Sequence, residues 1–171
     1  MRNRIIFIAI ISIFISILFN SIIKPNLGRG THHILAESTD LSEENIEDLR
    51  LHDNIRSSKI ISKYGDKMKE SRDVVDYNYF NLRKGIEVAV NSEDEILRVI
   101  ATDDELKTSK GIKIGNNDTD IRSAYGNDSY YRREQGMDII GYIDKEKSCS
   151  IEFWMVDNKV ELIRFDESLM K

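Results

Sequence analysis

A segment of the chain occurs twice, and this repetition constrains the fold more than any other feature of the sequence. Residues 51–65 align without a gap with residues 112–126, pairing Ile60 with Ile121, and both segments end in a Tyr-Gly dipeptide. Glycine accommodates the left-handed backbone conformation at a helix exit. Each segment therefore predicts a helix that ends at its glycine, and the pair indicates a duplicated unit.

The residues around each predicted helix extend the repeated unit. Capping-box patterns at residues 40–43 and 102–105 predict a short helix before it. Apolar side chains occupy alternate positions at residues 86–90 and 151–155, a spacing typical of half-buried strands. Each unit is thus predicted to be α-α-β-β-β, and the body of the chain an α+β fold with helices packed on an antiparallel sheet.

The start of the chain combines cations with a long apolar run. Two arginines precede residues 5–19, which are apolar except for Ser12 and Ser16. Extended to residue 23, the run forms about 28 Å of helix, enough to cross a bilayer core. No small-residue cleavage site follows closely, so an uncleaved signal-anchor is favoured over a cleaved signal peptide. The flanking cations place the N-terminus in the cytoplasm and the rest outside.

These patterns divide the chain into four parts. We expect a transmembrane helix, a tether, a first repeat and a second repeat, at residues 1–24, 25–39, 40–103 and 104–171 respectively. The tether is predicted because Pro25 ends the membrane helix and because Gly28 and Gly30 interrupt a stretch without apolar periodicity.

Composition narrows the classes of partner. The chain has 25 Lys and Arg against 30 Asp and Glu, and its first 24 residues contain no acidic residue. The remainder is therefore more acidic than the whole, which argues against a nucleic-acid partner, because such surfaces need a cationic patch. Cys149 is the only cysteine, so the fold contains no intramolecular disulfide.

Four short motifs carry a family resemblance. They are Gly-Ile-Lys-Ile-Gly at 111–115, Ala-Tyr-Gly at 124–126, Ile-Glu-Phe at 151–153 and Lys-Val-Glu-Leu-Ile-Arg at 159–164. In this order they resemble the BamE/SmpA-like and β-lactamase-inhibitor-protein-like modules of bacterial envelopes. The resemblance implies tandem copies of a helical pair on a curved sheet, a role in protein binding or envelope assembly, and no catalytic residue. Asp53 and Asn54 of the first copy depart from the pattern.

Candidate chemical sites are few. His32 and His33 are adjacent, without further ligands at metal-binding spacing, so we expect a solvated linker there. Cys149 lies in a polar turn before a strand, without the motif of an activated nucleophile. Residues 116–120 resemble the start of a calcium loop, but the repeat alignment explains them better as a helix N-terminus. No catalytic residue, metal site or cofactor is predicted.

Two places are candidates for recognition of a partner. Trp154 alternates with Phe153 and Met155 and so points to the opposite face of its strand, where it either anchors a partner or is covered by another part of the chain. Tyr130, Tyr131, Arg132 and Arg133 combine aromatic and guanidinium groups, which interfaces favour, although ordinary strand packing explains them as well.

Three functions remain open from the sequence. The first is a membrane-anchored extracytoplasmic interaction module, with the membrane as one partner through residues 5–23 and a protein or envelope component as the other. The second is a secreted inhibitor or immunity protein, released by signal cleavage near Ala36. The third is an envelope hydrolase that uses Cys149 or a pair of carboxylates. The first is favoured, and the protein is expected not to be an enzyme.

Overall fold

The computed structural model describes residues 2–19, 28–66, 68–74 and 77–168. The described helices are α1 (Arg2–Leu18), α2 (Arg29–Leu35), α3 (Ser58–Tyr64) and α4 (Asp118–Tyr125). The described strands are β1 (Lys69–Val74), β2 (Tyr77–Arg83), β3 (Ile86–Val90), β4 (Ile96–Ala101), β5 (Tyr130–Glu134), β6 (Met137–Asp144), β7 (Cys149–Val156) and β8 (Lys159–Glu167).

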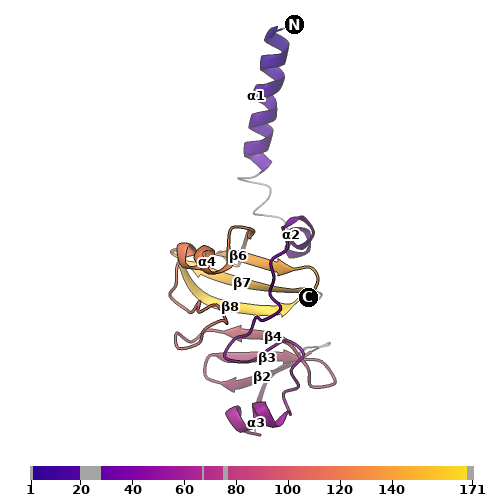
Figure 1. Ribbon diagram of the computed structural model, residues 1–171, viewed down its shortest axis with the longest axis vertical. Helices are drawn as coiled ribbons and strands as arrows, with labels where there is room; N and C mark the ends of the chain where they lie inside the picture. The colour runs from indigo at the N-terminus through magenta and orange to yellow at the C-terminus, as the bar shows by residue number, and fades with distance from the viewer. Residues whose placement is uncertain (1, 20–27, 67, 75–76, 169–171) are drawn as a thin grey trace.

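All eight strands form one antiparallel sheet with the order β1-β2-β3-β4-β8-β7-β6-β5. The sheet has two halves, β1 to β4 and β5 to β8, which meet where β4 pairs with β8 and Val99 lies opposite Phe165. In each half the first strand in the chain lies at the edge of the sheet and the last strand lies at its centre. One short helix precedes each run of four consecutive strands: α3 before β1 to β4, and α4 before β5 to β8. Figure 1 shows β2 to β4 below β6 to β8, with α3 and α4 at opposite ends of the body.

The hydrophobic core lies on one face of this sheet. Alternate residues of the strands point into it, and α3, α4 and the irregular segment at residues 41–55 cover them. Its largest fully buried members include Ile60 of α3, Ile121 of α4 and Phe153 of β7. Burial of this apolar surface is the main favourable term in the folding of the body.

The helix α4 begins and ends as the local sequence requires. The Asn117 side chain accepts a hydrogen bond from the Asp120 backbone, and the Asp120 side chain accepts one from the Asn117 backbone, which completes a capping box. At its other end the backbone N–H of Gly126 donates to the Arg122 carbonyl, with φ of 88°. This N-terminus accounts for residues 116–120, the segment that resembled a calcium loop.

The predicted α-α-β-β-β repeat is wrong. The residues expected to form the first helix of each unit form turns instead: Asp40 accepts from the Ser42 backbone, and Asp103 accepts from the Glu105 backbone. Such side-chain turns compete with helix formation at the same residue types. Each helix is followed by four strands rather than three, and β4 joins β8, so the body is one continuous sheet rather than a tandem pair. The boundary between residues 103 and 104 stays a prediction.

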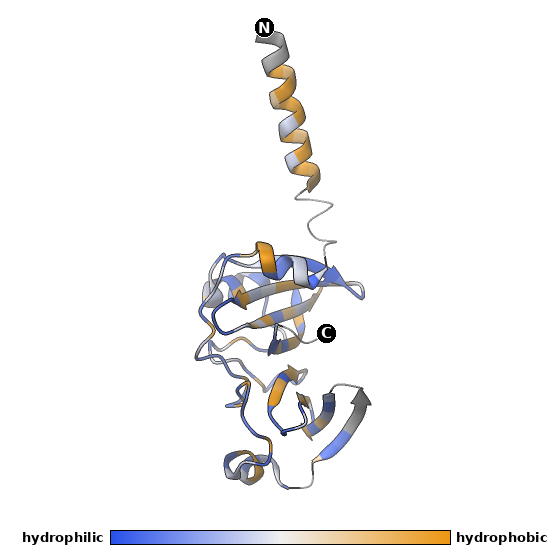
Figure 2. Ribbon diagram, turned by 90° about the vertical axis from the view of Figure 1, so that its right-hand side faces the viewer, coloured by the Kyte–Doolittle hydropathy of each residue, from blue (hydrophilic) through white to orange (hydrophobic). Residues whose placement is uncertain are grey.

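The predicted membrane-spanning helix over residues 5–23 is also corrected. The described helix α1 has 17 residues, about 26 Å of rise, and residues 20–23 lie outside the described part of the chain. No helix in the described ranges is long and apolar enough to cross a membrane. The transmembrane, signal-anchor and single-pass assignments therefore have no support. Figure 2 shows α1, hydrophobic over most of its length, standing apart from the sheet.

Candidate functional site

The face of the sheet opposite the core carries a cluster of charged side chains. Five of them form what we call the arginine–carboxylate network: Arg98 of β4, Arg132 of β5, Glu152 of β7, and Arg164 and Asp166 of β8. Strand alternation places them here, because their sequence neighbours, such as Phe153 and Phe165, point into the core. Glu152 and Asp166 are 0% exposed. Buried charges of this kind are tolerated only when they are paired.

Glu152 is the centre of one half of the network. The Arg132 guanidinium donates Nε to Oε1 at 2.8 Å and Nη2 to Oε2 at 2.9 Å, and Arg164 donates to the same carboxylate. Burial by itself raises the pKa of Glu152. The Arg132 hydrogen bonds and the neighbouring positive charges outweigh burial and lower this pKa to about 2. Glu152 is therefore ionised at every physiological pH.

Asp166 is the centre of the other half. Arg98 donates Nε to Asp166 Oδ2 at 3.0 Å, and its Nη1 donates to the Tyr79 hydroxyl oxygen at 2.9 Å. The Ser150 hydroxyl donates to Asp166 Oδ1 at 3.2 Å. Arg164 lies between the two carboxylates, since its Nε is 3.4 Å from Asp166 while its Nη2 reaches Glu152. The network is thus continuous across β4, β8, β7 and β5.

Tyr130 reaches Glu152 by lying across β6. Its partner on β6 is Gly141, and a Cβ atom at Gly141 would lie 2.1 Å from Tyr130 Cζ. The missing side chain at Gly141 therefore leaves room for the ring, and the Tyr130 hydroxyl donates to Glu152 Oε1 at 2.7 Å. Burial and the negative charge of Glu152 raise the pKa of Tyr130 well above its ordinary value, so this hydroxyl remains a donor.

Trp154 belongs to the same cluster. The guanidinium groups of Arg132 and Arg164 lie over its ring, at 5.4 Å and 5.0 Å from the centroid, and its indole N–H donates to Glu152 Oε2 at 3.2 Å. A guanidinium over an indole face is a favourable cation–π arrangement. Trp154 is only 5% exposed, so it is covered in this structure.

The helix α2 covers part of the network. Arg29 donates to the Ser150 hydroxyl at 2.7 Å and forms an ion pair with Asp166, while its Nε lies 3.6 Å from Glu152. His32 is 0% exposed and stacks on the Tyr130 ring at 5.3 Å. α2 therefore approaches the sheet with a cation and an imidazole ring.

The chain around α2 makes further contacts with the body. Thr39 donates its backbone N–H to the Ile143 carbonyl at 2.7 Å, and Lys145 donates to the Ile34 carbonyl at 3.2 Å. The apolar residues of the helix point away from the sheet, with Ile34 76% and Leu35 55% exposed. The predicted solvated linker at the two histidines is thus wrong for His32, and part of the predicted tether at 25–39 packs on the body.

The five residues predicted for binding do not form one surface. Tyr130, Arg132 and Trp154 meet in the buried network, whereas Tyr131 and Arg133 are exposed and both donate to Asp138. Sequence reasoning missed the residues that complete the network: Arg29, Arg98, Glu152, Arg164 and Asp166. The signal of the four strand residues is a charged side chain at alternate positions within an otherwise apolar strand, as in Ile-Glu-Phe and Ile-Arg-Phe-Asp; Arg29, in α2, has no such signal.

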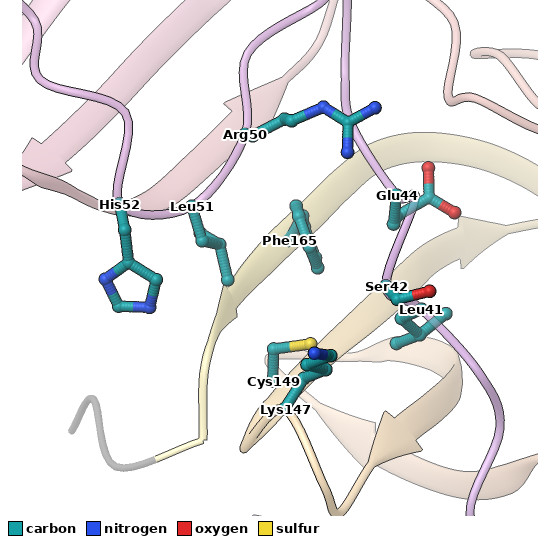
Figure 3. A pocket seen from close by; sticks show the side chains of 9 residues that line it. All are labelled: Leu41, Ser42, Glu44, Arg50, Leu51, His52, Lys147, Cys149 and Phe165. Carbon is teal, nitrogen blue, oxygen red and sulfur yellow. The ribbon is translucent and has the colours of Figure 1, made fainter.

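A second candidate is a pocket of about 190 Å³ beside residues 41–52, shown in Figure 3. Its lining consists of Leu41, Ser42, Glu44, Arg50, Leu51, His52, Lys147, Cys149 and Phe165. Figure 3 shows Cys149 next to Lys147, with His52 beside Leu51 on another side of the pocket. No hydrogen bond joins Cys149 to His52 in the described structure, so the lining lacks the thiol–imidazole pair of a cysteine nucleophile.

Two ionisable groups of this pocket, Glu44 and Cys149, are engaged or protonated. Glu44 accepts hydrogen bonds from the Ser109 hydroxyl and from the Tyr125 hydroxyl, both at 2.7 Å. Burial, with the nearby charge of Asp144, raises the pKa of the Cys149 thiol to about 12. A thiol with this pKa is not a nucleophile at neutral pH. Among the described residues, no group of three or more His, Cys, Asp or Glu side chains is arranged to hold a metal ion.

Comparison with known proteins finds few likenesses. No family model and no curated protein matches the chain. One similar solved structure is an extracellular protein containing an SCP domain from Bacillus anthracis, with 7% identity and a TM-score of 0.47. Another is a cysteine-rich secretory protein from Staphylococcus aureus, with 19% identity and a TM-score of 0.45.

Each match covers 68% of this chain but only 44% and 43% of the two solved chains, so this chain spans less than half of either. Neither is a BamE/SmpA-like or β-lactamase-inhibitor-protein-like module. The resemblance to those modules is wrong, because a single helix precedes each group of four strands and all eight strands form one continuous sheet.

Proposed function

We propose that this chain is an extracytoplasmic protein-binding domain without catalytic activity, and that its partner binds on the sheet face that α2 covers. The observation that carries the proposal is that this face already holds a polypeptide segment, through Arg29 and His32, while Ile34 and Leu35 of that segment remain exposed. A face that binds one segment through side-chain contacts has the chemistry to bind another.

The residues of the network support this choice. Arginine, tryptophan and tyrosine contribute most to protein interfaces, and all three meet here around Glu152. Their side chains are fixed by mutual hydrogen bonds before any partner arrives, which reduces the entropy lost on binding. The acidic body adds a preference for a partner surface that carries positive charge.

The extracytoplasmic location rests on the start of the chain. Arginines followed by an apolar run are typical of exported proteins. The two similar solved structures are themselves described as an extracellular and a secretory protein. A secreted inhibitor or immunity protein is one version of the proposed function, and it needs the same binding face.

The absence of catalytic activity is part of the proposal. It is supported at the Cys149 pocket, where burial holds the thiol protonated and Glu44 is occupied by two hydroxyl donors.

Position-specific crosslinking in the producing cell tests the binding face. A photoreactive amino acid replaces Leu162, which is paired with Trp154 on this face, and in a matched variant it replaces the exposed Ser62 of α3 on the other side of the sheet. We expect a partner to be crosslinked from Leu162 and not from Ser62, and excess unlabelled chain to abolish the product. Equal products from both positions, or none from Leu162, would refute the proposed face.

A further inference from the structure

Arg29 is bound by the sheet as a ligand is bound by a receptor. Its guanidinium meets the Ser150 hydroxyl, the Asp166 carboxylate and the Glu152 carboxylate, and its side chain is only 16% exposed. Both carboxylates are fully buried and come from neighbouring strands, β7 and β8. Two fixed carboxylates and a hydroxyl make a site for one guanidinium group.

The carboxylates of the network keep other partners when Arg29 is absent. Arg98 still pairs with Asp166, Arg132 with Glu152 and Glu134, and Arg164 with Glu152. Loss of one partner from a buried ion pair is normally strongly destabilising because it leaves a charge alone. Here no carboxylate is left alone, so the departure of Arg29 avoids that penalty.

The rest of α2 holds to the sheet weakly. A helix of seven residues is too short to be stable by itself, so it depends on its contacts with the body. Its two apolar residues are largely exposed, and the rings of His32 and His33 contact Tyr130, stacked at 5.3 Å and edge-on at 5.7 Å. A segment with so little apolar burial exchanges readily between a docked and an undocked state.

From these observations we infer that the sheet face recognises an arginine-bearing segment of the protein partner, and that α2 occupies the same site as an intramolecular competitor. The inference rests on the proposed function and names the chemistry of the partner. An ammonium group would reach one carboxylate as a point charge, whereas a planar guanidinium reaches Ser150, Asp166 and Glu152 together.

The competition also makes the site sensitive to where the exported chain begins. A mature N-terminus at or before Gly28 retains Arg29 and His32 and keeps the face covered. A mature N-terminus near Ala36 removes both residues and leaves the face open. Processing on either side of α2 therefore sets the availability of the site.

Peptide binding to the full chain tests the inference. The probe is a fluorescent synthetic peptide with the sequence of residues 28–39, added to the wild-type chain and to a chain with Arg29→Ala and His32→Ala, which weakens the competitor. We expect the double variant to bind the peptide at least ten-fold more tightly than wild type. The matched peptides carry Arg29→Lys or Arg29→Ala, and we expect the alanine peptide to bind at least ten-fold more weakly than the arginine peptide.

Two results would overturn the inference: no binding of the arginine peptide to the double variant, or equal binding of the arginine and alanine peptides. The single variant Arg29→Ala, which retains the ring stack of His32 on Tyr130, serves the same test if the double variant unfolds. Crosslinking from Leu162 reports on the proposed function separately. A partner captured from Leu162 without peptide binding would support the proposed function and refute the arginine site. Peptide binding without a captured partner would support the arginine site and refute the proposed function.

Discussion

The sharpest test of the network is the substitution Gly141→Ala. The added Cβ would lie 2.1 Å from Cζ and 2.5 Å from the hydroxyl oxygen of Tyr130, too close for any real contact. The ring must leave its place, and with it the hydrogen bond to Glu152. Overpacking costs about 1–3 kcal/mol, and a hydrogen bond to a charged group contributes about 1.5–3 kcal/mol. Together they give an expected loss of about 2.5–6 kcal/mol in the free energy of unfolding.

A double-mutant cycle separates this mechanism from a general intolerance of β6 to side chains. Tyr130→Ala removes the ring, so Gly141→Ala in that background should change the free energy of unfolding by less than about 0.5 kcal/mol. Tyr130→Phe keeps the ring and removes the hydroxyl, and we expect it to lose only the hydrogen-bond part, about 1.5–3 kcal/mol. Coupling between residues in contact is the quantity that such a cycle measures.

The assay is urea unfolding followed by tryptophan fluorescence. Trp154 is the only tryptophan and donates to the same Glu152 carboxylate, so its emission reports on this part of the sheet. The reasoning is refuted if Gly141→Ala costs as much in the Tyr130→Ala background as in wild type. It is also refuted if Gly141→Ala leaves stability unchanged in the wild-type chain.

Three further predictions concern other parts of the molecule. Alkylation of Cys149 at pH 8 should be at least about 100-fold slower in the native chain than in the unfolded chain, because burial raises the thiol pKa to about 12; equal rates would contradict the burial. Asn117→Ala should lower the free energy of unfolding by about 1 kcal/mol, because the Asn117 side chain caps α4. Ser57→Ala should change it little, because the Ser57 side chain makes no capping hydrogen bond to α3 in the described structure. Similar losses for the two variants in chemical denaturation would refute this difference. Burial and the charge of Arg29 lower the pKa of His33 from 6.5 to about 4, so protonation of His33 favours undocking of α2. The protection of the α2 amides from hydrogen exchange should therefore fall as the pH drops from 6.5 to 4. Constant protection across that pH range would contradict the docking.

The helix α4 shows what local sequence predicts well. Its cap at Asn117 and its exit at Gly126 depend on residues within one turn of each helix end, and both are visible in the sequence. Period-two alternation likewise placed Trp154 on the face opposite Phe153. The pattern at 102–105 misled because Asp103 uses its carboxylate to close a turn, a competing local bond that the same residues allow.

The strand count was missed for a different reason. The segments between each predicted helix and its three strands form the additional strands β1 and β5. The strand β5 has the sequence YYRRE, in which buried residues alternate with exposed ones but no aliphatic side chain occurs. Such a strand, at the edge of the sheet, is recognised from its pairing with β6 rather than from its own residues.

The candidate site was beyond the reach of sequence because its cover comes from far away in the chain. Glu152 and Arg164 look like solvent-facing strand residues until Arg29 and His32, more than a hundred residues earlier, are placed over them. That cover lies in a stretch without apolar periodicity, which is why it was predicted to be a tether. The same property makes α2 displaceable: a cover held by one guanidinium and two imidazole rings can be replaced by a segment that offers the same groups. Its weak sequence signal and its proposed role as a competitor have one physical origin, the small apolar area that α2 buries.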